Sequence, residues 1–461
     1  MHKYRRTKNK TKKNLKQINK SYKSFKPYKS FKSYKTLRGG KFLGEGSYGC
    51  VVTPAIPCNK SKNNSSLKLS LKQSVSKIII APTEDDKEEF IISNKLKNLD
   101  SNQKYFITFK DACYIKQIPD ERSNTVKVKY DNNSHESYDI LDKKKHDKEY
   151  CPIDLKLNPI NFIMPYGGYD LTTILNKKKV SPHIELTRHM LLKHFKSCFK
   201  NLLIGIKILH DARIVNRDIK IDNIMVNYNI NYNLNYNVKE NKANKANKAN
   251  SEEQIKIINT IIKEQHHTQS QAQIDNERKN LDIRYIDFGL SSILKPSFCE
   301  KIYNIDIRGT SGLISPELVI AFYINDSKKY DDIKKTVNKE IKSMLNSLKD
   351  SKLTLNFDKL ILELYEKIKV EFKSKDILSK FFGSETNKYN GYLQKGDIFL
   401  LGLTMYYFLK KYKNNFKNSK FCNTYLNNIK LINLLQNMIN IDPEHRYNVL
   451  ACLKHPYFIE K

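Results

Sequence analysis

The pattern of hydrophobic and polar positions predicts a small β-rich part followed by a larger helical part. Apolar or alternating runs predict strands at 74–80, 105–108 and 160–164. Between the first two runs, residues 84–97 have the spacing of a helix. From Leu171 onward the apolar period is mostly helical, most clearly over 186–209 and 397–410. This outline predicts an α+β chain.

Two stretches interrupt the pattern and are expected to be insertions, at about 227–280 and 325–392. The first contains NYNINYNLNYNV and NKANKANKAN, which are low-complexity repeats typical of a tolerated surface insertion. The second has apolar residues at helical spacing, which predicts helices that dock on the body of the protein. One such face comprises Val337, Ile341, Met344 and Leu348, and another comprises Phe357, Ile361, Leu364, Ile368 and Phe372.

The charge of the chain is concentrated at its N-terminus. Lys and Arg outnumber Asp and Glu by 83 to 48, and residues 1–38 contain fifteen of the basic residues and no acidic one. Lysines and aromatic residues recur there with a period of three, which in a polyproline II conformation would align them along separate edges. Such a segment could follow a phosphate backbone while its rings stack on bases. The same composition is typical of a disordered basic tail, so we expect a disordered tail and hypothesise polyanion contact through it.

Cysteine spacing and hydropathy bear on the location of the protein. The eight cysteines are scattered, without the spacing of a zinc site, and we interpret them as reduced thiols. The N-terminus does not have the pattern of a secretory signal, and the apolar run 398–409 is too short to cross a bilayer. We therefore expect no membrane span and an intracellular location, in the cytoplasm or, given the basic tracts, the nucleus.

A glycine-rich segment opens the ordered-looking sequence and has the pattern G-x-G-x-x-G-x-V. Glycines let backbone N–H groups approach phosphate oxygens without interference from side chains. The motif is weak alone, since it could be an ordinary turn, but the residues after it favour a strand rather than a helix. Its members are Leu43, Gly44, Glu45, Gly46, Ser47, Tyr48, Gly49, Cys50 and Val51.

Two later motifs place acidic and amide groups on loops next to strands. Asp218 and Asn223 lie in N-R-D-I-K-I-D-N, and Asp287 opens D-F-G after an apolar run. In phosphoryl transfer one carboxylate orients the attacking hydroxyl, while another carboxylate and an amide oxygen hold Mg²⁺ on the phosphates. The order of the three motifs makes coincidence remote and predicts Asn223 and Asp287 as metal ligands.

With these motifs, the chain resembles the eukaryotic-type serine/threonine protein kinase family and, more loosely, the kinases of large DNA viruses. The resemblance continues through 309–317, 397–402 and 442–458. It implies a bilobal protein-kinase-like fold over 39–461, with a β-rich N-lobe at about 39–165 and a helical C-lobe at about 166–461. It also implies a buried structural ion pair between Glu317 and Arg446.

The resemblance further implies roles for individual residues. Asp218 would be the catalytic base and Lys220 would neutralise charge on the transferring phosphoryl group. Lys77, in the apolar strand after the glycine-rich segment, would bind the phosphates of ATP and pair with Glu89 or, as the alternative, Glu88. The adenine pocket would be formed by Leu43, Val51, Val75, Met164, Gly167 and Met225.

Departures from the family pattern are few. Asn216 stands where His is usual, Phe399 where Trp is usual, and Ser315 where Ala is usual. The usual His helps to brace the Asp-Phe-Gly segment, and Asn216 can still donate a hydrogen bond. Arg217 suggests a pocket for a phosphate on the activation segment between Asp287 and Glu317. The candidate phosphorylation sites are Ser291, Ser292, Ser297, Tyr303 and Ser311.

The expected function is transfer of the γ-phosphate of ATP, with Mg²⁺, to Ser or Thr hydroxyls of protein substrates. The alternatives are a pseudokinase scaffold, a small-molecule phosphotransferase of related fold, and a nucleic-acid-associated protein that acts through its tail. If the chain is viral, it would act in the host cell or the virion. Retention of Lys77, Asp218, Asn223 and Asp287 favours an active enzyme over a scaffold.

Overall fold

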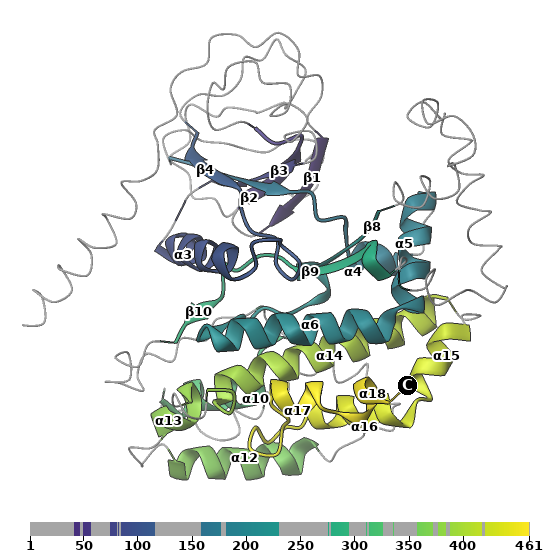
Figure 1. Cartoon of the computed structure of the whole chain (residues 1–461). Helices are drawn as coiled ribbons and strands as arrows, with labels where there is room; N and C mark the ends of the chain where they lie inside the picture. Colours follow the sequence, from purple (N-terminus) through teal and green to yellow (C-terminus); the bar gives the residue numbers. More distant parts are fainter. Residues whose placement is uncertain are drawn as a thin grey trace, which may run out of the picture. The chain divides into compact units, whose positions relative to one another are not determined.

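The structure is a computed structural model. The residues that it describes are 41–46, 49–56, 74–80, 82, 84–115, 158–176, 181–229, 275, 278–294, 310, 313–325, 335, 357–371, 377–383, 388–416 and 420–460. The expected basic tail and most of the insertion at 227–280 lie outside these residues. The chain divides into two units, one formed by Met1–Lys87 with Thr108–Tyr166 and the other by Glu88–Ile107 with Gly167–Lys461. Helices and small antiparallel sheets are both present, which makes the chain α+β, as its sequence predicts (Figure 1).

The first unit contains one five-stranded antiparallel sheet in the order β1-β2-β3-β5-β4. Its strands are β1 (Lys41–Gly46), β2 (Gly49–Thr53), β3 (Ser74–Ile79), β4 (Asp111–Tyr114) and β5 (Ile160–Pro165). The predicted strands at 74–80 and 160–164 are confirmed, and β2 confirms that a strand follows the glycine-rich segment.

The predicted strand at 105–108 is wrong, and residues 105–107 of that segment belong to the second unit. Only Phe106 forms a β-bridge there, with Tyr285. The carboxylate of Asp100 accepts the backbone N–H groups of Lys104, Tyr105 and Phe106 at 2.7–3.0 Å. This cap disfavours a strand, because those donors are no longer available to a strand partner.

The second unit is mainly helical. Its helices are α3 (Glu84–Leu99, whose first turn belongs to the first unit), α4 (Leu171–Leu175), α5 (Pro182–Lys193), α6 (Phe195–Asp211), α10 (Pro316–Asn325), α12 (Phe357–Glu371), α13 (Ile377–Phe382), α14 (Tyr392–Asn415), α15 (Lys420–Leu426), α16 (Ile429–Met438), α17 (Val449–Leu453) and α18 (Pro456–Ile459). Its short strands are β6 (Tyr169–Asp170), β7 (Ile214–Val215), β8 (Ile224–Tyr228), β9 (Leu281–Tyr285) and β10 (Ser292–Ile293), with a 3₁₀ turn, η2, at Ile221–Asn223. They form the sheets β6-β8-β9 and β10-β7.

Helices α6 and α14 lie side by side in the second unit and supply much of its core (Figure 1). The predicted helix at 397–410 lies within α14, which is 24 residues long and buried along most of its length. The predicted helix at 186–209 is instead two helices, since the backbone of His194, with φ −107° and ψ 21°, ends α5 before α6 begins. Within the part of the chain that the structure describes, no helix is both long and apolar enough to cross a membrane.

Helix α12 shows how the insertion at 325–392 attaches to the second unit. Ile361, Leu364 and Ile368 are buried, and α12 packs against α10. On the neighbouring face, Lys367 Nζ lies 3.0 Å from Asp442 Oδ2 and 2.7 Å from Glu444 Oε2. The prediction that this apolar face docks on the body is confirmed for these three residues. The side chains of Phe357 and Phe372, and the face that begins at Val337, lie outside the described residues.

The cysteines differ from the expectation of reduced thiols. Cys198 and Cys452 are free and buried, but Cys50 and Cys113 are disulfide-bonded. These two are not bonded to each other, because β3 and β5 separate their strands and three strand spacings amount to about 14 Å. Wide cysteine spacing therefore did not exclude disulfides.

Candidate active site

A buried carboxylate anchors the loop between β7 and η2. Asp397, on α14, accepts the backbone N–H of Asn216 at 2.9 Å and that of Arg217 at 2.8 Å. His210 Nε2 lies 3.1 Å from the same carboxylate. Arg217 has a φ of +66°, a left-handed conformation that costs on the order of 1 kcal/mol for a residue with a side chain. The two bonds from the loop to Asp397 hold the backbone in this conformation.

Asp218 follows directly and is the centre of a hydrogen-bonded cluster. Its side chain is buried, and the Thr310 hydroxyl donates to its Oδ1 at 2.5 Å. Its Oδ2 lies 2.9 Å from Lys220 Nζ and 2.7 Å from Asn223 Nδ2. Lys220 also donates to the Thr310 hydroxyl at 2.6 Å. Both carboxylate oxygens are therefore fixed in direction by partners from the loop and from Thr310.

Asn223 and Asp287 were predicted to bind the metal, and the structure brings their backbones together. The amide nitrogen of Asn223 donates to Asp218 O at 3.0 Å, so its Oδ1 points away from Asp218. The N–H of Ile286 donates to Asn223 O at 3.0 Å, which places Asp287 next to Asn223. Asp287 is exposed and has a φ of +60°.

These donors suit Mg²⁺ held jointly with phosphates. Mg²⁺ binds through one or two carboxylates and completes its octahedron with water and substrate oxygens. Among the residues that the structure describes, no group of three or more His, Cys, Asp or Glu side chains could form a cage made by protein alone. One carboxylate and one amide oxygen, from Asp287 and Asn223, fit the joint arrangement.

The two candidate partners of Lys77 differ in their surroundings. Glu89 is buried, whereas Glu88 is half-buried. A Cβ added to Gly289 would lie 3.4 Å from Glu89 Oε2 and 3.4 Å from Asp287 Oδ1, so both carboxylates lie close to this glycine. The position of Glu89 beside the D-F-G segment favours it over Glu88. Its pairing with Lys77 stays a prediction, because Lys77 belongs to the first unit.

Four of the predicted nucleotide-binding residues of the first unit share one face of its sheet. Val51 lies opposite Lys77, and Val75 lies opposite Met164. Directly opposed residues point to the same side, and Val75 and Lys77 are two positions apart, so all four side chains lie on one face. Leu43, on β1, is 41% exposed.

The glycine-rich segment forms the hairpin of β1 and β2, in which Gly46 is opposite Gly49 and Glu45 is opposite Cys50. Because strand residues alternate, the side chain of Cys50 lies on the face opposite Lys77, so it could approach a nucleotide there only through its backbone. Ser47 and Tyr48 lie outside the described residues, as does the side chain of Glu45.

Gly167 and Met225, the remaining predicted adenine contacts, meet in the second unit. A Cβ at Gly167 would lie 2.4 Å from Ile107 Cδ1 and 3.2 Å from Met225 Cγ, so a larger residue there would have to displace the end of the Ile107 side chain. The convergence of Lys77 with Asp218 and Asp287 stays a prediction, since these residues belong to different units.

Sequence reasoning missed several contacts of the site. It includes Thr310 and Asp397 only within the family-like segments 309–317 and 397–402. Thr310 binds Asp218 directly, and Asp397 binds Asn216 directly. Ser291, one of the candidate phosphorylation sites, is not accessible in the described structure. Its side chain is buried, and its hydroxyl donates to Asn216 O at 3.2 Å.

The structure describes only one of the other candidate phosphorylation sites. Ser292 is half-buried in β10, opposite Val215. Ser297, Tyr303 and Ser311 lie outside the described residues. The role of Arg217 in receiving a phosphate therefore stays a prediction.

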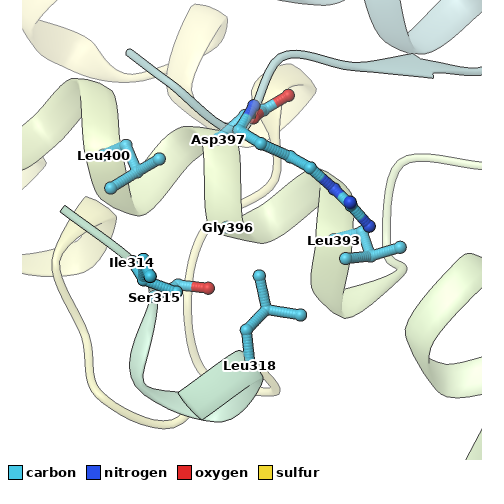
Figure 2. Close-up of a pocket in the computed structure, with 8 residues that line it drawn as sticks. Ile314, Ser315, Leu318, Leu393, Gly396, Asp397 and Leu400 are labelled. Carbon is cyan, nitrogen blue, oxygen red and sulfur yellow. Dashed lines mark hydrogen bonds between the residues drawn. The ribbon is translucent and has the colours of Figure 1, made fainter. Parts of the chain in front are cut away.

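A small pocket lies where the residues at the start of α10 meet α14. Its lining is mostly apolar, and Figure 2 shows the Ser315 hydroxyl pointing toward the space between Leu318 and Leu393. Ser315 is buried, and its hydroxyl has no hydrogen-bond partner among the described residues. The residues that line the pocket are Arg217, Ile314, Ser315, Leu318, Leu393, Gly396, Asp397 and Leu400.

The predicted ion pair between Glu317 and Arg446 is confirmed. Arg446 Nη1 lies 2.7 Å from Glu317 Oε1, and Nη2 lies 2.9 Å from Oε2, with both side chains fully buried. The guanidinium stacks 4.8 Å from the ring centre of Phe399, the residue that replaces the usual Trp. This pair joins α10 to the loop before α17.

Comparisons with known proteins do not identify a family for this chain. No family model matches the chain. The chain is 30% identical over 129 residues to the nitrogen permease reactivator protein of Saccharomyces cerevisiae (strain ATCC 204508 / S288c), a stretch that covers 24% of this chain and 14% of that protein. The likeness is confined to a small part of both proteins and does not show a family.

Proposed function

We propose that the chain is an ATP-dependent serine/threonine protein kinase with a bilobal kinase-like fold. The observation that carries the proposal is the cluster around Asp218, where Lys220, Asn223 and Thr310 bind a buried carboxylate. To orient an alcohol nucleophile toward a phosphate, a site needs a carboxylate that is held in one direction and a lysine beside it. The spacing of Asp218, Asn223 and Asp287 in the sequence supports the same chemistry.

In the proposed reaction, Asp218 accepts a hydrogen bond from the substrate hydroxyl and orients its oxygen toward the γ-phosphate of ATP. Lys220, already 2.9 Å from Asp218, donates to the phosphoryl oxygens on which charge develops. Asn223 and Asp287 would hold Mg²⁺, which when bound neutralises charge on the phosphates. Lys77 and the glycine-rich segment would position the nucleotide, with Glu89 orienting Lys77.

The test is phosphate transfer from radiolabelled ATP to generic basic and acidic proteins, with wild type compared with Lys77→Met. We expect incorporation into Ser and Thr that requires Mg²⁺ and falls to background in the variant. A wild-type chain that binds ATP without transferring phosphate would indicate the pseudokinase alternative. Phosphorylation of small molecules but of no protein would indicate the related small-molecule class.

A second candidate function, polyanion binding, rests on residues 1–38. Their fifteen basic residues, no acidic residue and three-residue period favour contact with a phosphate backbone. Filter binding of a duplex and of a single strand at several salt concentrations, with and without residues 1–38, tests this. Equal affinity and equal salt dependence of the two forms would reject it.

A further inference from the structure

Asn216 makes three hydrogen bonds at the centre of the catalytic loop. It is buried, and its backbone N–H donates to Asp397 at 2.9 Å. Its carbonyl accepts the Ser291 hydroxyl at 3.2 Å. Its side-chain Oδ1 accepts the backbone N–H of Asp218 at 3.0 Å. Of these three bonds, only the last uses the side chain.

That last bond closes a local ring around Arg217. An Asn side chain that accepts the N–H two residues on forms an Asx-turn, which stabilises a bend in the backbone between the two residues. The enclosed residue, Arg217, has the left-handed φ of +66°. Asn216 therefore supports the strained residue directly before Asp218 and also fixes the amide of Asp218.

In the family pattern, a His at position 216 helps to hold the D-F-G segment in place. In this chain other residues hold that segment. Phe288 is buried and packs edge-on against Phe106, with ring centres 5.8 Å apart. Ser291 ties the segment after Phe288 to the Asn216 carbonyl, a contact that any residue at position 216 could accept. The side chain of residue 216 is thus released from bracing and bonds to Asp218 instead.

We propose that Asn216 is a positioning residue that orients Asp218 through the bond from its Oδ1 to the Asp218 amide. The inference rests on the proposed kinase function. Loss of the acceptor leaves a buried N–H without its partner and frees the loop to rotate Asp218. Displacement of a catalytic group by about 1 Å lowers turnover by up to about 100-fold, while nucleotide binding by other residues persists.

The experiment compares two replacements that fill the same space. Asn216→Leu is close to Asn in shape but has no acceptor, whereas Asn216→Asp keeps an acceptor oxygen. We expect kcat to fall about tenfold or more in the Leu variant, with the KM for ATP nearly unchanged, and to recover most of its value in the Asp variant. Asn216→Ala replaces the Leu variant if that protein does not fold.

Asn440 offers a matched control in the same unit. Its Oδ1 accepts the N–H of Asp442 at 3.0 Å, the same kind of bond at the same distance, but outside the catalytic loop. Asn440→Leu should leave kcat at the wild-type value. Equal losses of kcat in the Leu and Asp variants of Asn216, or no loss in the Leu variant, would overturn the proposal.

Hydrogen exchange at the Asp218 amide separates this inference from the proposed function. We expect faster exchange in Asn216→Leu than in wild type, and near wild-type exchange in Asn216→Asp. If the wild-type chain transfers no phosphate, the proposed function fails, and exchange still decides the positioning role. Identical exchange in the two variants would reject that role even in an active enzyme.

Discussion

Removal of Glu317 should destabilise the protein more than the loss of any single exposed ion pair. Both side chains of the pair with Arg446 are fully buried, and two charge-assisted hydrogen bonds of 2.7 and 2.9 Å join them. In Glu317→Ala, the guanidinium keeps only its bonds to backbone carbonyls, at 2.8 to 3.2 Å. A buried charge without its partner costs about 3–5 kcal/mol.

Urea unfolding followed by far-UV circular dichroism measures this loss, since the chain has no Trp for fluorescence. Arg446→Met should cost a similar amount, and the double variant should cost less than the sum by about 2 kcal/mol or more. As a control, Glu363→Ala removes an exposed pair with Lys359 and should change stability by less than about 0.5 kcal/mol. Single-variant losses below about 1 kcal/mol, or losses that simply add in the double variant, would refute the argument.

Three further predictions follow from the contacts of the site, the docked insertion and the tail. Thr310→Ala removes the hydroxyl that binds Asp218, so kcat should fall about tenfold in steady-state assays, whereas Thr310→Ser should keep most of it. The hydrogen bond from Lys367 lowers the pKa of Glu444 to about 2 from an ordinary 4.5. The stability from this pair is therefore present above pH 4.5 and lost as the pH falls toward 2, and Lys367→Met should flatten the dependence of the unfolding midpoint on pH in that window. Deletion of residues 1–38 should weaken DNA binding and reduce the slope of log K against log salt by about 0.9 for each phosphate that the tail neutralises.

Periodicity and local motifs were enough to predict many of the elements, because these depend on nearby residues. Helix α3 and strands β3 and β5 match their predicted positions. The failure at 105–108 came from a side-chain cap, in which Asp100 took the N–H groups that a strand would have used. The break at His194 likewise depends on a backbone conformation that hydrophobic spacing does not encode.

The contacts that organise the site span much longer distances along the chain. Thr310 reaches Asp218 across 92 positions, and Asp397 reaches Arg217 across 180. No spacing rule predicts such contacts, since they depend on how the helices pack. The family resemblance supplied the ion pair of Glu317 and Arg446 correctly, but it led to an expectation for Asn216 that differs from its observed bond to Asp218.

The most direct test of the central claim is the rate at which the full chain transfers the γ-phosphate of ATP to Ser or Thr in the presence of Mg²⁺, compared between wild type and Asp218→Asn. The proposed chemistry predicts a fall in kcat on the order of 10²–10⁴-fold, with ATP affinity nearly unchanged, because Asp218 orients the hydroxyl and does not hold the nucleotide. Equal rates in the two proteins, or no transfer by wild type with any protein substrate, would contradict it.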